Sequence, residues 1–155
     1  MNIRQSITCV VAVFIVLIGM NTYVGFNSSQ KLGALLDYIS GPAWNAADGA
    51  MEGQIGLEAQ IIALQKLYHN EATYAEIQTV FEDAIAMENE ALTRMKNSGL
   101  MSPATIANLD QQLTEYHTTR DALINKLQSG AVAVTEYQQL NNQLDELLNF
   151  IGKME

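Results

Sequence analysis

Residues 136–155 read EYQQLNNQLDELLNFIGKME, and the spacing of their apolar side chains decides the fold class. These side chains recur at alternating steps of three and four residues, as in the seam of a helix that packs against other helices. The seam comprises Tyr137, Leu140, Leu144, Leu147, Ile151 and Met154. Leucine, alanine, glutamine and glutamate, all good helix formers, dominate the whole chain, so the sequence predicts an all-α protein.

Helix-boundary signals divide the chain upstream of this segment. Thr73–Glu76 and Thr135–Gln138 fit capping boxes, and Ser102–Pro103 fits an N-cap followed by proline at the first helical position. Gly99 and Gly130 stand where left-handed helix C-caps are expected. The signals predict four helices, at about residues 42–70, 74–98, 103–128 and 136–155. Their similar lengths and short connections favour an antiparallel up-down-up-down four-helix bundle.

An uncharged apolar segment precedes the bundle. Ile7–Phe26, ITCVVAVFIVLIGMNTYVGF, has about 20 residues and would span about 30 Å as a helix. A signal peptide would have a shorter apolar region and a small-residue cleavage site, which Met20–Phe26 does not offer. We therefore expect an N-terminal transmembrane helix at 7–26. Arg4 on its flank predicts a cytoplasmic N-terminus, residues 1–6, in the inner (cell) membrane.

Residues 27–155 are then expected to form an extracytoplasmic, periplasmic sensor domain. Gly41–Pro42 is expected to break or kink its first helix, because proline removes a backbone hydrogen bond and clashes with the preceding turn. The helix that leaves the membrane is much longer than the last one. The fourth helix is therefore expected to be truncated, with the natural chain continuing past Glu155 to a second membrane span.

Composition excludes several function classes. The chain of 155 residues carries a formal net charge of −9, which argues against nucleic acid and against anionic lipid surfaces. Its single cysteine, Cys9, lies inside the apolar segment, so no disulfide is expected outside the membrane. His69 and His117 lack metal-ligand spacing, and no catalytic arrangement of side chains is visible. We expect no metal, no cofactor and no enzymatic activity.

The apolar segment after Arg4 and the stretch Gly41–Gly56, GPAWNAADGAMEGQIG, resemble the ligand-binding region of bacterial chemoreceptors, the methyl-accepting chemotaxis proteins with a four-helix-bundle sensor domain. The resemblance implies a homodimer in which ligand binding shifts helix 4 relative to helix 1. It also implies a small-molecule ligand or a periplasmic binding protein as partner. The cytoplasmic chemotaxis kinase and adaptor would act only through a missing C-terminal part. One departure is that residues 32–69 contain a single cation, Lys66, whereas familiar amino-acid receptors of the family use arginines there.

Arg120 is the sharpest candidate for ligand binding. Helical spacing places it in the core between Tyr116 and Leu123, where an unpaired guanidinium is costly. It is expected either to clamp a ligand carboxylate, with His117, Tyr116 and Glu58 nearby, or to pair with an acid of a neighbouring helix. The acids Glu82, Asp83, Glu88 and Glu90 are expected to form a solvated face, with cation or amine binding as the alternative. Trp44 is expected to fill a core or an interface.

Small residues at steps of three and four form a stripe on the first helix of the bundle. Such residues let two helices approach closely, either at a dimer seam, in a ligand groove or within one bundle. The predicted dimer seam comprises Ala43, Ala46, Ala50, Gly53 and Leu57.

The function expected from these features is that of the extracytoplasmic sensor region of a chemoreceptor. Two alternatives remain open: the sensor region of a histidine kinase or a diguanylate cyclase, and a membrane-tethered periplasmic adaptor bundle with a structural role.

Overall fold

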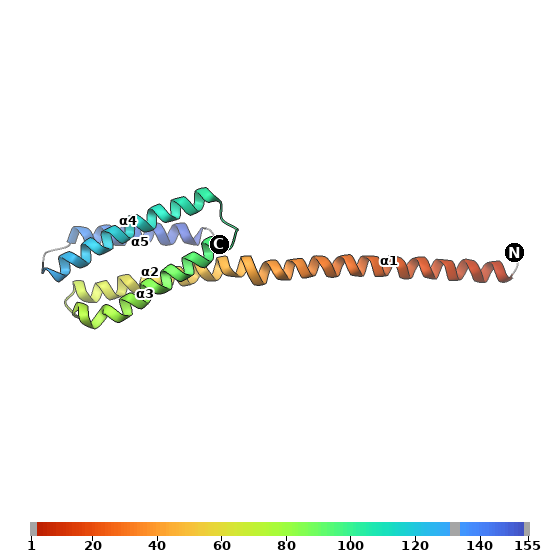
Figure 1. Ribbon diagram of the computed structural model, residues 1–155, viewed down its shortest axis with the longest axis horizontal. Coiled ribbons are helices and arrows are strands. Elements are labelled where there is room, and N and C mark those ends of the chain that lie inside the picture. Colours follow the sequence, from red (N-terminus) through yellow and green to blue (C-terminus); the bar gives the residue numbers. More distant parts are fainter. Residues whose placement is uncertain (1–2, 131–133, 154–155) are drawn as a thin grey trace. The chain divides into compact units, whose positions relative to one another are not determined.

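The fold is all-helical, as predicted. The computed structural model describes residues 3–130 and 134–153, and within these ranges it contains no strand. The elements are α1 (Ile3–Tyr38), the π-helical turn η1 (Ile39–Ala43), α2 (Trp44–Tyr68), α3 (Tyr74–Asn97), α4 (Pro103–Gln128) and α5 (Val134–Gly152) (Figure 1). The chain divides into two compact units, residues 1–40 and 41–155, which are described separately.

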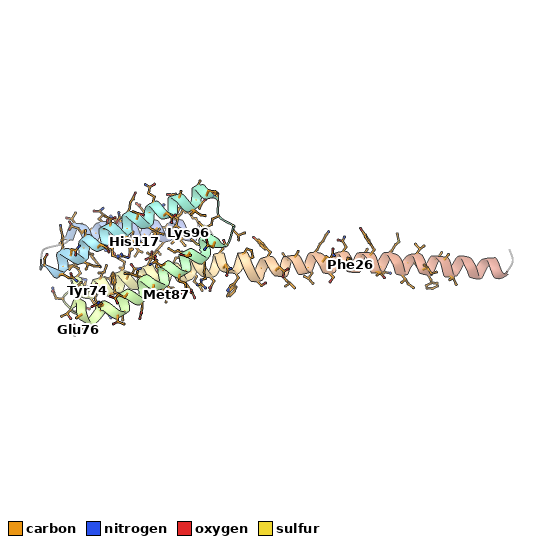
Figure 2. The ribbon with its side chains drawn as sticks, in the orientation of Figure 1. Phe26, Tyr74, Glu76, Met87, Lys96 and His117 are labelled. Carbon is orange, nitrogen blue, oxygen red and sulfur yellow. The ribbon has the colours of Figure 1, made fainter. Side chains whose placement is uncertain are left out.

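The first unit consists of α1. This helix is long and apolar enough to cross a membrane. Its described side chains, from Val11 onward, are exposed, and Figure 2 shows Phe26 projecting from it.

The helical hydrogen bonding changes register where Gly41–Pro42 predicts a disruption. Residues Ile39–Ala43 form a π turn that contains Pro42, and α2 begins directly after it. A π turn accommodates the missing proline N–H by widening one turn of helix instead of ending the helix. The disruption predicted at Gly41–Pro42 therefore takes the form of a π turn.

Boundaries in the second unit follow the turn chemistry of the sequence. The Ser102 hydroxyl accepts a hydrogen bond from the Thr105 N–H, with Pro103 as first helical residue. The Glu76 carboxylate accepts from the N–H and the hydroxyl of Thr73. Gly99 and Gly130 have φ of 78° and 72°, the left-handed conformation expected of helix C-caps.

One boundary differs from the prediction. Helix α5 begins at Val134, so Thr135 lies inside the helix instead of capping it, and the N-cap position falls outside the described residues. Glu136 forms an ion pair with Lys126 of α4.

Helices α2 to α5 enclose one hydrophobic core. Cross-helix pairs join α2 to α3, α3 to α4 and α4 to α5, and in the first two of these helix pairs the residue numbers run in opposite directions. The heptad positions of α5 from Leu140 to Ile151 are buried, as predicted, and Met154 lies outside the described residues. The largest fully buried apolar side chains are Tyr116, Leu57, Leu64, Leu92, Met95, Leu109, Leu123, Leu140, Leu147 and Ile151.

The small-residue stripe of α2 packs against α3 inside this unit. A Cβ atom added at Gly49 would lie 2.5 Å from the Ala91 carbonyl oxygen, and one at Gly56 would lie 2.7 Å from the Glu88 nitrogen. Such distances leave no room for a side chain, so the stripe lets the backbones of α2 and α3 approach closely. Glycine, which has no side chain, is therefore needed at both positions.

This packing corrects the predicted dimer seam. Ala50, Gly53 and Leu57 are buried within the chain, and Ala43 and Ala46 are half-buried. The sequence could place these residues on one face of the helix, but the face turns toward α3 of the same chain.

Candidate functional site

A polar cluster interrupts the apolar core of the second unit. Among the described residues, the buried polar or charged side chains are Gln60, Glu88, Thr119 and Arg120. Thr119 satisfies its hydroxyl locally, on the Glu115 carbonyl of its own helix. The other three come from α2, α3 and α4 and bond to one another, so the cluster ties three helices together.

Arg120 is buried, with 8% of its surface exposed. Its Nη1 donates to the Gln60 Oε1 at 3.0 Å, and its Nε donates to the Asp121 Oδ1 at 2.9 Å. The guanidinium carbon lies 5.8 Å from the centroid of the buried Phe81 ring, within range of a cation–π interaction. The guanidinium is therefore balanced by one carboxylate at the edge of the core and by neutral groups inside it.

Gln60 connects this cation to an anion. Its side chain is fully buried, and its Nε2 donates to the Glu88 Oε2 at 2.7 Å while its Oε1 accepts from Arg120. These two partners fix the orientation of the amide, because the nitrogen can only donate and the oxygen can only accept. Gln60, on α2, thus links α4 to α3 through its two hydrogen bonds.

Glu88 is the most deeply buried acid of the cluster, with 1% of its side chain exposed. Its second oxygen, Oε1, lies 2.8 Å from the His117 Nε2. This contact joins α3 to α4. His117 is 31% exposed, and its ring lies at the boundary between Glu88 and the surface of α4.

Tyr116 adds an unsatisfied group to the same region. Its side chain is fully buried, and its hydroxyl has no hydrogen-bond partner among the described residues. Burial raises the pKa of this hydroxyl, and the Glu88 carboxylate raises it further, while Arg120 acts in the opposite direction. A buried hydroxyl without a partner is uncommon and marks a place where a water molecule or a ligand would be stabilised.

A groove runs beside the cluster between α3 and α4. It has a volume of about 250 Å³, with Glu88 and His117 at one end and Lys96 and Asp110 at the other. Leu92 and Leu113 also line it. Lys96 and Asp110 form an ion pair of 2.8 Å. Figure 2 shows His117 and Lys96 on the neighbouring helices that border the groove.

A second hollow of about 560 Å³ lies at the turn between α2 and α3. Leu67, Glu71, Tyr74 and Leu127 line it, together with Glu76, whose carboxylate is already occupied by Thr73. None of the buried polar residues named above reaches it. The groove beside Glu88 is therefore the better candidate for specific recognition.

The structure brings together three of the four predicted ligand-binding residues. Arg120, His117 and Tyr116 belong to the cluster, whereas Glu58 is exposed on α2 and does not join it. The partner of Arg120 inside the core is an amide, Gln60, which the sequence reasoning did not single out.

The prediction for Glu88 was wrong. It was expected in a solvated acidic face, and Glu82, Asp83 and Glu90 are indeed exposed, but Glu88 is buried. The spacing of Glu88 in the sequence could have predicted its burial, because steps of three and four residues place it on the same face of α3 as Ala84, Ala91 and Met95.

Trp44, expected in a core or an interface, is 62% exposed within this chain. Among the described residues, no group of three or more histidine, cysteine, aspartate or glutamate side chains could hold a metal ion. The chemistry that the cluster offers is thus hydrogen bonding and charge recognition. Comparisons with protein-family models, with curated proteins and with solved structures found no match to this chain.

Proposed function

We propose that this chain is the membrane-anchored, extracytoplasmic ligand-binding region of a signalling receptor, of the kind found in bacterial chemoreceptors. The observation that carries the proposal is the buried cluster Arg120–Gln60–Glu88–His117, which joins three helices beside a groove. Buried charges contribute little net stability compared with apolar packing, so their presence favours a role in recognition or switching. No catalytic step is part of the proposal.

The arrangement of the chain supports this role. We propose that α1 is a transmembrane helix, with residues 1–6 in the cytoplasm, and that α2 to α5 form an antiparallel up-down-up-down bundle in the periplasm. The opposite numbering of the α2–α3 pairs and of the α3–α4 pairs supports the up-down order, and the apolar surface of α1 supports the span. A ligand that disturbs the cluster would change the packing of α4 and α5 against α2. This change would be passed to a cytoplasmic signalling part.

A thermal-shift screen of small molecules on the full chain in detergent micelles tests the ligand-binding role. A ligand that binds the folded state raises its unfolding temperature by mass action. We expect a hit whose effect is lost in Arg120→Ala and kept in Gln111→Ala, an exposed residue of the same helix. Hits that are indifferent to Arg120→Ala and to His117→Ala would contradict a ligand site at the cluster.

The homodimer that the resemblance implies needs a different surface from the one first expected. The outer face of α2 carries four exposed apolar residues, Trp44, Met51, Ile55 and Ile62, at steps of seven, four and seven residues. This is the spacing of a helix–helix seam, and it lies opposite the glycine face that packs on α3. We propose that a second copy covers this face, since a stripe of this width fits one further helix.

Charged substitutions test the dimer. Met51→Glu and Ile55→Glu should weaken self-association by about tenfold or more, because each would place a carboxylate in an apolar seam. Ala122→Glu, on the exposed face of α4, is the matched control. Sedimentation of the full chain in detergent gives the readout, and unchanged association of both α2 variants would argue against this seam.

The same exposed face supports a second candidate function, a membrane-tethered adaptor bundle. In that case the face would bind a different protein and the cluster would have only a structural role. Association of the purified chain with itself through Met51 and Ile55 favours the receptor, and a purely monomeric chain favours the adaptor. Sensor regions of histidine kinases and diguanylate cyclases share the receptor architecture and remain within the first proposal.

A further inference from the structure

The groove between α3 and α4 carries an excess of negative charge. Its ionisable residues are two carboxylates, Glu88 and Asp110, one ammonium group, Lys96, and the imidazole of His117. The carboxylates of the groove therefore outnumber its ammonium groups by one. The protein as a whole, with a net charge of −9, adds to the attraction of cations.

Glu88 is the source of this excess. Its two direct partners are the neutral Gln60 amide and the His117 ring, while Arg120 bonds to Gln60 and Asp121 and not to Glu88. A buried carboxylate is stabilised most strongly by a cation in contact with it. A carboxylate has about four acceptor sites, of which these two hydrogen bonds use two, so it can accept a further donor.

At the far end of the groove a second carboxylate, that of Asp110, lies at the surface. Asp110 pairs with Lys96, but its side chain is 53% exposed, and such surface pairs are weak. Eight residues of α3 and seven of α4 separate the two ends, which is about 10–12 Å at about 1.5 Å per residue. Leu92 and Leu113 line the groove and offer contacts to an alkyl chain.

We infer that this groove binds a linear diamine, with one ammonium group on Glu88, the other on Asp110 and the methylene chain along the leucines. The inference rests on the ligand-binding role proposed above and names the class of ligand. A dicarboxylate is disfavoured, because it would have to approach Lys96 and His117 while lying against the Glu88 and Asp110 carboxylates. The His117 ring contacts the Glu88 Oε1, so we expect this ring to move when the ammonium enters.

Titration calorimetry on the full chain in detergent micelles tests the inference. The probes are putrescine, cadaverine and spermidine, with butylamine as the monoamine and succinate as the dianion. The diamines should bind at least about tenfold more tightly than butylamine, because the second ammonium gains a charge-assisted contact. Succinate should not bind. Equal affinities for butylamine and the diamines, or binding of succinate instead, would overturn the inference.

Two variants assign the ends of the groove without removing the buried acid. Asp110→Asn should reduce the affinity for diamines to that of butylamine and leave butylamine unchanged. His117→Lys places an ammonium group beside Glu88 and should abolish binding of every amine. Glu115→Gln, on the exposed face of α4, is the control and should leave all affinities unchanged. Diamine binding that survives both variants would refute the assignment.

This experiment separates the ligand class from the function. If no amine binds but another small molecule stabilises the chain in a manner that depends on Arg120 and His117, the diamine is rejected and the receptor role stands. If neither amines nor any other small molecule binds, both proposals fail.

Discussion

At the scale of single residues, Gln60 is the least obvious and the most consequential member of the cluster. It is neutral, yet it holds a cation and an anion apart in the core, with Arg120 on its oxygen and Glu88 on its nitrogen. Neither charged group reaches the other directly, and each makes one hydrogen bond to the amide beside its contact with Asp121 or His117. The loss of this amide removes one hydrogen bond from each of two buried charged groups at once.

Gln60→Leu should therefore destabilise the protein by about 2–4 kcal/mol, even though leucine is the more apolar residue. Chemical unfolding followed by circular dichroism measures the change. Gln65→Leu, at an exposed position of the same helix, should change stability by no more than about 0.5 kcal/mol. Equal stabilities of the wild type and Gln60→Leu would mean that the cluster does not hold these helices together.

Glu76 gives the bundle a dependence on pH at the start of α3. Hydrogen bonds from the Thr73 backbone N–H and hydroxyl lower the pKa of the Glu76 carboxyl below its ordinary value of 4.5. A group whose pKa is lowered by folding stabilises the folded state above its unfolded-state pKa, and this stabilisation is lost as the pH falls through the folded-state pKa. Wild type should exceed Glu76→Gln in stability near neutral pH, and the difference should close below about pH 4.5.

Unfolding midpoints measured from pH 7 to pH 3 test this sign. In a Thr73→Ala background the difference should be smaller, because one of the two donors to Glu76 is missing. A difference that grows on acidification would show that the stabilisation comes from another group.

At the scale of elements, α2 has two unlike faces that both follow helical spacing. One face is built of small residues and fits tightly against α3, and the opposite face carries Trp44, Met51, Ile55 and Ile62 and is exposed. Close approach of the α2 and α3 backbones brings Gln60 within reach of Glu88. The glycines therefore position the polar cluster as well as the packing of the hairpin.

Gly49→Ala and Gly56→Ala should each destabilise the protein by about 1–3 kcal/mol, because the added methyl group meets backbone atoms of α3 that cannot move aside. Helix propensity alone predicts the opposite sign, a gain of about 1 kcal/mol per substitution. Gly33→Ala, in α1, is the control, since its Cβ would have no other atom within 4 Å. Thermal unfolding decides between packing and propensity, and a gain in stability for both α2 variants would contradict the tight contact.

At the scale of the whole molecule, the two units differ in how they expose or bury their apolar side chains. Helix α1 exposes the apolar side chains from Val11 onward, whereas the described core side chains of residues 41–155 lie on α2 to α5. Apolar side chains enclosed in this way are removed from water, and those on the described part of α1 are not.

Residues 41–155 expressed alone should be helical and should unfold cooperatively on heating, because they form a compact unit with a hydrophobic core of their own. Circular dichroism and calorimetry provide the test. Leu123→Asp, which places a charge in the centre of the core, should abolish the transition. A broad, non-cooperative transition in the parent fragment would show that the bundle depends on its anchor.

The proposed topology is tested by labelling with a membrane-impermeant maleimide. In a Cys9→Ser background, Ala122→Cys on α4 should react in cells with a permeabilised outer membrane. Gln5→Cys should react only after the inner membrane is disrupted, because the positive-inside rule keeps this end in the cytoplasm. The reverse pattern would place the bundle in the cytoplasm.

The sequence by itself determined the helices, their ends and most of the core. Heptad spacing, capping residues and two left-handed glycines are local signals, and a helix forms from local hydrogen bonds, so residue patterns predict it well. The position of Arg120 in the core also followed from spacing, because the residue replaces an apolar side chain in a regular stripe.

Only the tertiary structure decided which face of each helix meets which neighbour. In the structure the small residues of α2 face α3, and Glu88 is buried while the neighbouring acids are exposed. Gln60, and not Glu58, bonds to Arg120. These choices depend on contacts between segments far apart in the chain. A single helix period states which residues share a face, but the partner of that face is fixed by the packing of all four helices at once.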